Sequence, residues 1–77
     1  MPVAFVLINT EMGAENEVIK TLKKINDVKE AHVVYGVYDI IVKVEAKSSD
    51  ELRNVITWSI RKQDKVRSTL TLMTADE

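Results

Sequence analysis

Two runs rich in β-branched residues flank a single glycine, Gly36, near the middle of the chain. β-branched and aromatic side chains favour the pleated, half-buried surface of a strand. Glycine readily adopts the positive φ angles that a tight reversal requires. The pattern therefore predicts a β-hairpin with strands over Val28–Tyr35 and Tyr38–Ala46 and a turn at about Gly36.

The segments before this hairpin have two different periods. Val3–Ile8 is a continuous apolar run, which is typical of a strand buried on both faces. From Ala14 the period becomes that of a helix, with acidic residues first and lysines last, as the helix dipole favours. Asn26 and Asp27 end this helix. Its apolar stripe consists of Val18, Leu22 and Ile25, with Ile19 beside them.

The segments after the hairpin predict a second helix and a last strand. Ser48 and Ser49 are good caps, and the helix that they begin runs to about Arg61 or Lys62. Val66–Thr74 then alternates as a strand does, and we expect the tail at 75–77 to fray. The apolar stripe of the helix consists of Leu52, Val55, Ile56, Ser59 and Ile60, with Trp58 at its edge, expected at the rim of the core or in a subunit contact.

The order β-α-β-β-α-β predicts an α+β, ferredoxin-like fold in a single domain over residues 1–77. Right-handed crossovers place both helices on one face of a four-stranded antiparallel sheet. We expect the first and third strands to be central and parallel to each other, and the last strand to pair with the first.

The sheet face without helices needs a partner. On the first strand both alternating sets are apolar, so a second copy of the same sheet is the economical cover, in a dimeric α/β barrel. On the third strand the corresponding set, Ile41, Lys43 and Glu45, is half polar, so burial should fade away from the hairpin end.

Composition supports an oligomer. A chain of 77 residues without cysteine has a marginal core and no disulfide to stabilise it. Its 11 basic and 12 acidic residues create no overall field for nucleic acid. The apolar start is too short to span a bilayer and has no basic leader. We expect a cytoplasmic protein with no direct nucleic-acid or membrane partner.

Few residues suggest catalysis. His32 is the single histidine and lies in a predicted strand, and no acid–base pair or phosphate-binding glycine loop is recognisable. We expect no catalytic residue, metal or cofactor. The alternative is a small dimeric α/β-barrel enzyme in which His32 faces a cavity inside the protomer and assists proton transfer to or from an organic substrate.

The hairpin turn and the last strand together suit a small zwitterion. A free amino acid requires donors for its carboxylate, an acceptor for its ammonium group and an apolar wall. Taken alone, Asp39 is explained by capping of the turn and the threonines by β-propensity. The hydroxyls of Ser68, Thr69 and Thr71 need not meet Asp39 within their own chain, but they could meet it across an interface. The candidate ligand-binding residues are Gly36, Val37, Tyr38, Asp39, Thr69 and Thr71.

The sequence resembles the C-terminal effector domain, called RAM, of Lrp/AsnC transcriptional regulators. The resemblance covers essentially the whole chain and rests on the G-x-x-D turn from Gly36, followed by an apolar strand, and on the V-x-x-T-x-T strand from Val66. It implies a ferredoxin-like domain that dimerises through its sheets, assembles into tetramers of dimers, and binds an amino acid between dimers. By resemblance Gly36, Tyr38 and Asp39 lie at the ligand, with Thr69 and Thr71 nearby.

One departure limits what the resemblance implies about transcription. These regulators carry an N-terminal helix-turn-helix, whereas the first predicted strand here begins almost at Met1. We therefore expect a stand-alone RAM domain that senses an amino acid and modulates a full-length Lrp/AsnC regulator or another partner. A ligand-free assembly adaptor is the remaining alternative.

Overall fold

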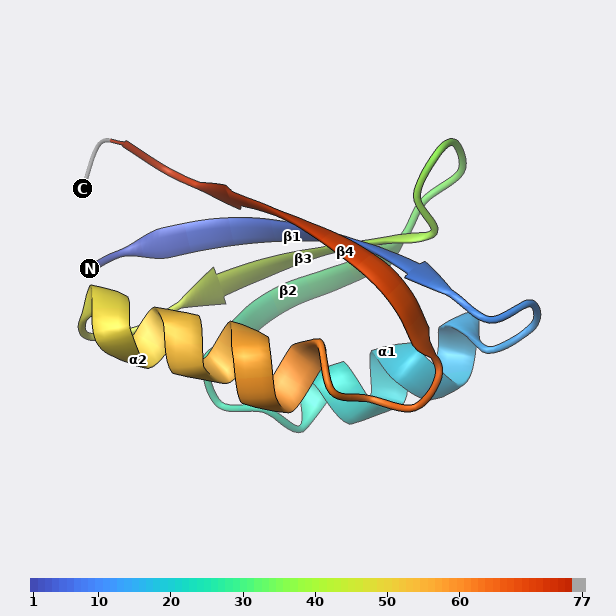
Figure 1. Cartoon of the computed structure of the whole chain (residues 1–77), viewed down its shortest axis with the longest axis horizontal. Coiled ribbons are helices and arrows are strands. Elements are labelled where there is room, and N and C mark those ends of the chain that lie inside the picture. The colour runs from blue at the N-terminus through green and yellow to red at the C-terminus, as the bar shows by residue number, and fades with distance from the viewer. Residues whose placement is uncertain (76–77) are drawn as a thin grey trace.

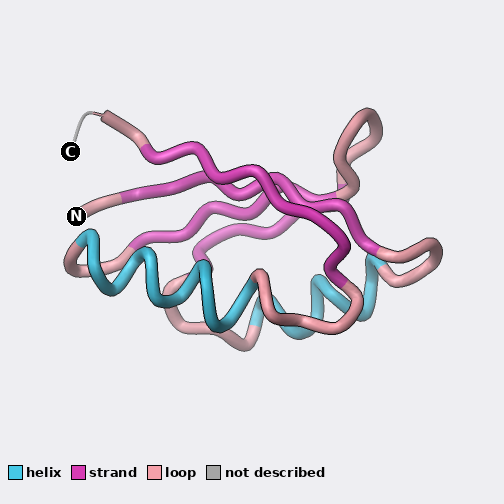
Figure 2. Tube along the Cα trace, viewed as in Figure 1, coloured by secondary structure: helices cyan, strands magenta, loops and turns pink. Residues whose placement is uncertain are grey.

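The computed structural model describes residues 1–75 and shows a four-stranded sheet with its helices packed on one face (Figure 1). The strands form one layer and the helices a second (Figure 2). The expected fraying of the tail at 76–77 falls outside the described residues. The elements are β1 (Val3–Thr10), α1 (Glu15–Lys23), β2 (Val28–Val33), β3 (Ile40–Glu45), α2 (Ser49–Asn54), a π-helical segment η1 (Val55–Ile60) and β4 (Val66–Met73).

The ferredoxin-like order is confirmed, with one error in strand direction. The sheet order is β2-β3-β1-β4, so β1 and β3 are central and β4 pairs with β1, as expected. However, β1 and β3 are antiparallel, with Ile8 opposite Ile40 and Val3 opposite Glu45. The crossover through α1 makes β1 and β2 parallel, and the β2–β3 connection then reverses the chain. Because β3 lies between them, it is antiparallel to both.

The connection between β2 and β3 is longer than the tight turn that the sequence predicted. The strands end at Val33 and begin at Ile40, and residues 34–39 form a loop that rises from the sheet on the side opposite the helices (Figure 1). Tyr35 is 98% exposed and Val37 is 83% exposed, so almost none of either side chain is buried in the protomer. Burial therefore does not favour continuing the strands through these residues. Gly36 is in the loop, as expected, with φ of +147°.

The helices follow their predicted stripes. Val18 and Leu22 of α1 are buried, and the first turn of α1 is acidic and its last turn basic. The Ser48 side chain accepts a hydrogen bond from the Glu51 N–H, which confirms the cap of α2. The second helix extends to Ile60 as predicted, but from Val55 it has the wider π-helical turn. In an α-helix, residues spaced four apart overshoot one full turn and move gradually around the helix. The wider π-helical turn reduces this movement, so that Leu52, Ile56 and Ile60 all stay on the buried side.

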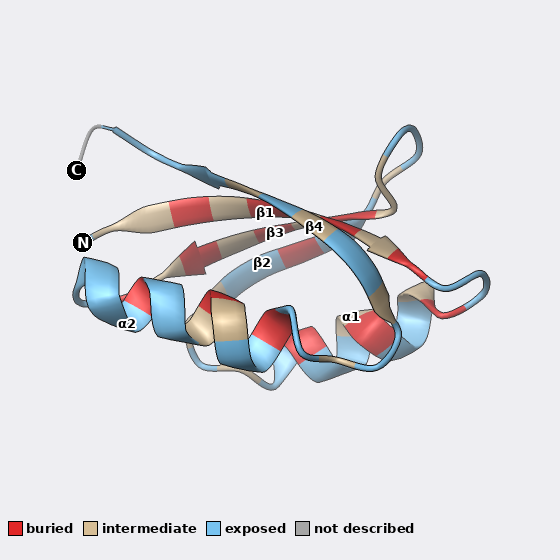
Figure 3. Ribbon diagram, in the orientation of Figure 1, coloured by how far each residue is buried: buried red, intermediate tan, exposed pale blue. Residues whose placement is uncertain are grey.

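The core lies between the sheet and the helices. Buried and half-buried positions alternate along β1 and β3 (Figure 3), and the buried set is the one that faces the helices. Trp58 is 66% exposed and does not pack at the rim of this core. The largest fully buried side chains are Ile8, Leu22, Ile40, Leu52 and Ile60, with Val6, Val18, Val42 and Val44.

The opposite face of the sheet, which we call the open sheet face, is apolar at its centre. Leu7 of β1 pairs with Ile41 on one side and Leu70 on the other, and Phe5 pairs with Leu72. Leu70 is 43% exposed and Leu72 is 51% exposed. Lys43 and Glu45 make the β3 part of this face polar away from the loop, and the expected decrease of burial there against a partner stays a prediction. The helices therefore cover only one of the two apolar sets of β1.

Candidate functional site

Asp39 connects the β2–β3 loop to β1. Its backbone N–H donates to the Ile8 carbonyl at 2.9 Å, and its own carbonyl accepts from the Val34 N–H at 2.8 Å. Its carboxylate Oδ2 accepts from the Thr10 N–H at 3.0 Å and from the Thr10 hydroxyl at 3.5 Å. The Asp39 carboxylate therefore accepts a hydrogen bond from a backbone N–H, as expected of a capping residue, but that N–H belongs to β1 and not to the turn.

The ends of the strands explain this contact. The last β1–β3 pair joins Ile8 to Ile40. Thr10 is two residues further along β1, so its N–H points towards the β3 side of β1, as that of Ile8 does, but lies beyond the first residue of β3. Thr10 is only 6% exposed, and a buried N–H without an acceptor is costly. The Asp39 carboxylate replaces the strand carbonyl that this N–H would otherwise meet.

A hollow of about 370 Å³ lies beside Asp39, and we call it the Asp39 hollow. It is lined by Asn9, Thr10, Asp39, Arg67 and Ser68. The Asp39 carboxylate and the Arg67 guanidinium give it an acceptor and a planar donor of opposite charge. The Asn9 side-chain amide donates to the Ser68 hydroxyl oxygen at 3.3 Å. An ammonium group and a carboxylate of one small molecule both have a complementary group here.

A second hollow, of about 310 Å³, lies on the other side of Asp39, towards the start of α1. Asp39 is thus shared by two surface depressions, and the loop forms part of the second. The lining residues of this second hollow are Glu15, Asn16, Val33, Val34, Tyr35 and Asp39.

The predicted ligand residues fall into two groups in the protomer. Gly36, Val37 and Tyr38 share the loop with Asp39, where Tyr38 is half-buried and the other two are exposed. Thr69 and Thr71 lie on β4, opposite Ile8 and Val6, on the face of the sheet that the helices cover. Neither threonine lines the Asp39 hollow, although Arg67 and Ser68 of the same strand do, so one protomer does not bring the threonines into this hollow.

Four lining residues of the Asp39 hollow were not among the predicted site residues. Asn9 and Thr10 follow the apolar run of β1, and a polar pair at the end of a strand is a weak signal. Arg67 and Ser68 directly precede Thr69 and lie at a shift in the β1–β4 register between Asn9 and Thr10. This irregularity places Arg67 in the hollow and is not visible in the sequence pattern.

His32 lies on the open sheet face, opposite Ile41, and not in an internal cavity. Its side chain is 62% exposed, and its Nε2 atom is 3.3 Å from the Glu30 carboxylate. The enzyme alternative, which requires His32 to face a cavity inside the protomer, is therefore wrong. Residues 1–75 contain no cluster of three or more histidine or acidic side chains able to hold a metal ion.

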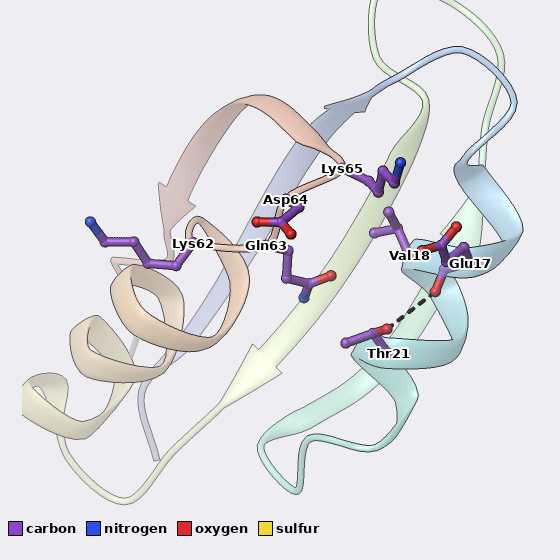
Figure 4. Close-up of a pocket in the computed structure, with 7 residues that line it drawn as sticks. All are labelled: Glu17, Val18, Thr21, Lys62, Gln63, Asp64 and Lys65. Carbon is purple, nitrogen blue, oxygen red and sulfur yellow. Dashed lines mark hydrogen bonds between the residues drawn. The ribbon is translucent and has the colours of Figure 1, made fainter.

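Another hollow, of about 380 Å³, lies between α1 and the connection that leads to β4 (Figure 4). The α1 wall contributes one acidic side chain, Glu17, and the other wall carries both acidic and basic side chains. The Thr21 hydroxyl donates to the Glu17 carbonyl at 3.3 Å, and Lys65 is 3.9 Å from Glu11, so part of this polar surface is satisfied within the chain. The lining residues are Glu17, Val18, Thr21, Lys62, Gln63, Asp64 and Lys65.

None of the helices in residues 1–75 combines the length and apolar character needed to cross a bilayer.

The family model of the Lrp/AsnC ligand binding domain matches residues 3–77. The chain belongs to this family. Its fold agrees with the crystal structure of FFRP-DM1, with a TM-score of 0.93 and 44% identity over 96% of this chain and 99% of that one. A transcriptional regulator of Neisseria meningitidis, NMB0573, solved in complex with L-methionine, shares the fold at 12% identity, with a TM-score of 0.87 over 99% of this chain and 51% of that one.

Curated relatives contain a similar segment within longer chains. Homocitrate synthase of Saccharolobus islandicus is 54% identical over 54 residues, which are 70% of this chain and 12% of the synthase. The HTH-type transcriptional regulator FL11 of Pyrococcus horikoshii is 36% identical over 53 residues, which are 69% of this chain and 35% of the regulator. Segments similar to this chain thus occur in an HTH-type transcriptional regulator and in a homocitrate synthase, and the chain spans only a small part of each.

Proposed function

We propose that this protein is an oligomeric, cytoplasmic amino-acid-sensing module that binds a free amino acid beside Asp39 and modulates a partner protein. The observation that supports this most directly is the Asp39 hollow, in which a carboxylate and a guanidinium lie on one polar surface. Membership of a ligand-binding domain family agrees with such a site.

The roles of the residues follow from their hydrogen-bonding capacity. Asp39 uses Oδ2 for Thr10, and within the described residues its Oδ1 atom accepts no hydrogen bond, so Oδ1 is available to a ligand ammonium group. Arg67 and Ser68 supply donors for the carboxylate. Gly36, Val37 and Tyr38 would form a loop wall for the ligand side chain.

The threonines would act only between copies. Thr69 and Thr71 do not line the Asp39 hollow in the protomer, so we assign them to the ligand site of a neighbouring dimer in a tetramer of dimers. The site would be complete only in the assembly, which would couple ligand binding to oligomeric state.

The dimer would form by packing of the open sheet face against a second copy. Burial of one large apolar side chain contributes about 1.5–3 kcal/mol, and this face presents several such side chains. This gain is substantial for a chain of 77 residues, whose own core is small. The apolar residues of the face are Val3, Phe5, Leu7, Ile41, Leu70 and Leu72.

Two partner classes follow from the relatives. The similarity to FL11 supports a full-length Lrp/AsnC regulator as the protein that co-assembles with this module. The 54% identity to a segment of homocitrate synthase supports a second candidate, in which the module regulates an enzyme of amino-acid metabolism as a separate subunit. Both candidates require the same amino-acid site.

Calorimetric titration with each of the twenty standard amino acids tests the proposal. We expect at least one to bind at millimolar concentration or tighter and to change the elution volume in size-exclusion chromatography. If an amino acid binds without changing assembly or stability, the proposed coupling between ligand binding and oligomeric state is contradicted. If none binds, the sensing function fails, and the ligand-free adaptor takes its place.

A further inference from the structure

Positive charge and hydrogen-bond donors gather in a hollow at the outer edge of the sheet, where β4 is the edge strand. The hollow has a volume of about 300 Å³, and none of the described residues that line it is acidic. We propose that it binds an oxyanion, a phosphate or carboxylate group of a small molecule, at a site that adjoins the amino-acid site, shares Arg67 and Ser68 with it and is distinguished from it by Arg61. Its lining residues are Arg61, Val66, Arg67, Ser68 and Thr69.

The donors in this hollow are available. Neither Arg61 nor Arg67 belongs to the ion pairs formed within residues 1–75, which involve other residues. The Ser68 oxygen accepts from Asn9 at 3.3 Å, which leaves its own O–H free to donate outward. Two guanidinium groups and a hydroxyl suit the several lone pairs of an oxyanion, because charge-assisted and bidentate hydrogen bonds are the strong ones.

The helix end nearby opposes an anion, but too weakly to cancel the arginines. Arg61 caps the C-terminal end of η1, where the helix dipole amounts to about half a negative charge. The two guanidinium groups carry two full positive charges, so the hollow remains positive. Charges on an edge strand also discourage pairing with other strands, a role that requires no ligand. Binding measurements separate these two roles.

Arg61 distinguishes this site from the Asp39 hollow. Arg67 and Ser68 line both hollows, whereas Arg61 lines only the one at the β4 edge. Loss of the Arg61 charge should therefore weaken oxyanion binding and leave amino-acid binding unchanged.

The test is an NMR titration of the ¹⁵N-labelled oligomer with inorganic phosphate and, separately, with glutarate, against sodium chloride of equal ionic strength. We expect saturable shifts of the amides at residues 61 and 66–69 with phosphate, glutarate or both, and none with chloride. Tighter binding of phosphate would assign a phosphate group, and tighter binding of glutarate a carboxylate. Shifts that do not saturate, or that chloride reproduces, would overturn the proposal.

The matched variants are Arg61→Gln and Arg53→Gln. Arg53 lies on α2, outside the hollow and 4.0 Å from Asp50, so its loss removes the same charge from the same helical region. We expect Arg61→Gln to weaken binding of the tighter probe about tenfold or more, since a charge-assisted contact is lost, and Arg53→Gln to bind as the wild type does. Equal binding by all three proteins would show that general surface charge attracts the anion and that the hollow is not a site.

Discussion

The carboxylate of Asp39 and the backbone N–H of Thr10 lie 3.0 Å apart and join the start of β3 to the end of β1. The residue that we propose at the ligand ammonium group therefore also stabilises the protomer. Because one carboxylate performs both tasks, binding and stability should change together when it is removed, and they should separate when only its charge is removed.

Asp39→Ala should lower the free energy of unfolding by about 1–3 kcal/mol, because it leaves the buried Thr10 N–H without an acceptor. Asp39→Asn should cost less, since the amide oxygen still accepts. Urea denaturation measures both values. Thr10→Val is the control, because it removes only the hydroxyl contact of 3.5 Å and keeps the N–H bond. A wild-type stability for Asp39→Ala would show that this bond contributes nothing to the fold.

Gly36→Ala should lower the free energy of unfolding by about 1 kcal/mol through backbone strain. The φ angle of Gly36 is +147°, and an added Cβ would meet no atom within 4 Å, so a steric clash is not the cause. The comparison variant is Val37→Ala, which shortens an exposed side chain of the same loop at a residue that does not have a positive φ angle. If the two variants are equally stable, the loop has relaxed to another conformation.

Ser48→Ala should cost about 1 kcal/mol of stability, because the Ser48 hydroxyl caps the Glu51 N–H at 3.2 Å. Ser49→Ala removes a hydroxyl one residue later, inside the first turn of α2, and should change stability by less than half as much. Thermal unfolding of the two proteins compares them directly. Equal losses would mean that Ser48 is not the functional cap.

Leu70→Lys should convert the proposed dimer to monomer, because it places a charge at the centre of the open sheet face. Leu70 is 43% exposed in the protomer, so the fold itself should tolerate the lysine. Met12→Lys makes the same kind of change in the β1–α1 connection, at a side chain that is 99% exposed, and should leave the dimer intact. Sedimentation velocity distinguishes these outcomes. A Leu70→Lys protein that sediments as the wild type does would exclude this face from the interface.

Much of the fold could be predicted because its periodicities are local. Val18 and Leu22 of α1, and the alternation along β1 and β3, give the elements and their buried faces directly. The predicted direction of β3 relative to β1 was wrong, because this direction depends on the path of the chain through β1, α1, β2 and β3 together. The π-helical geometry from Val55 was also missed, since the apolar spacing of a π-helix over one turn resembles that of an α-helix.

The site was predicted only where its residues are neighbours in sequence. Gly36 and Asp39 share one loop, as the sequence predicted, and their role at a ligand stays a prediction. The hydrogen-bond partner of Asp39 is Thr10, which is 29 positions earlier in the chain, and Arg67 lines the same hollow from the other side of β1. Their proximity depends on strand register and on the shift between β1 and β4, which no local pattern encodes.

The most direct test of the sensing function is calorimetric titration of three proteins with the amino acid that the wild type binds most tightly. Asp39→Asn keeps an acceptor for Thr10 and removes the charge proposed for the ligand ammonium group, whereas Asp64→Asn removes a carboxylate that lines the hollow of Figure 4 instead. We expect Asp39→Asn to bind at least about tenfold more weakly and Asp64→Asn to bind as the wild type does. Equal affinity for the wild type and Asp39→Asn, or no amino acid bound by the wild type, would contradict the account.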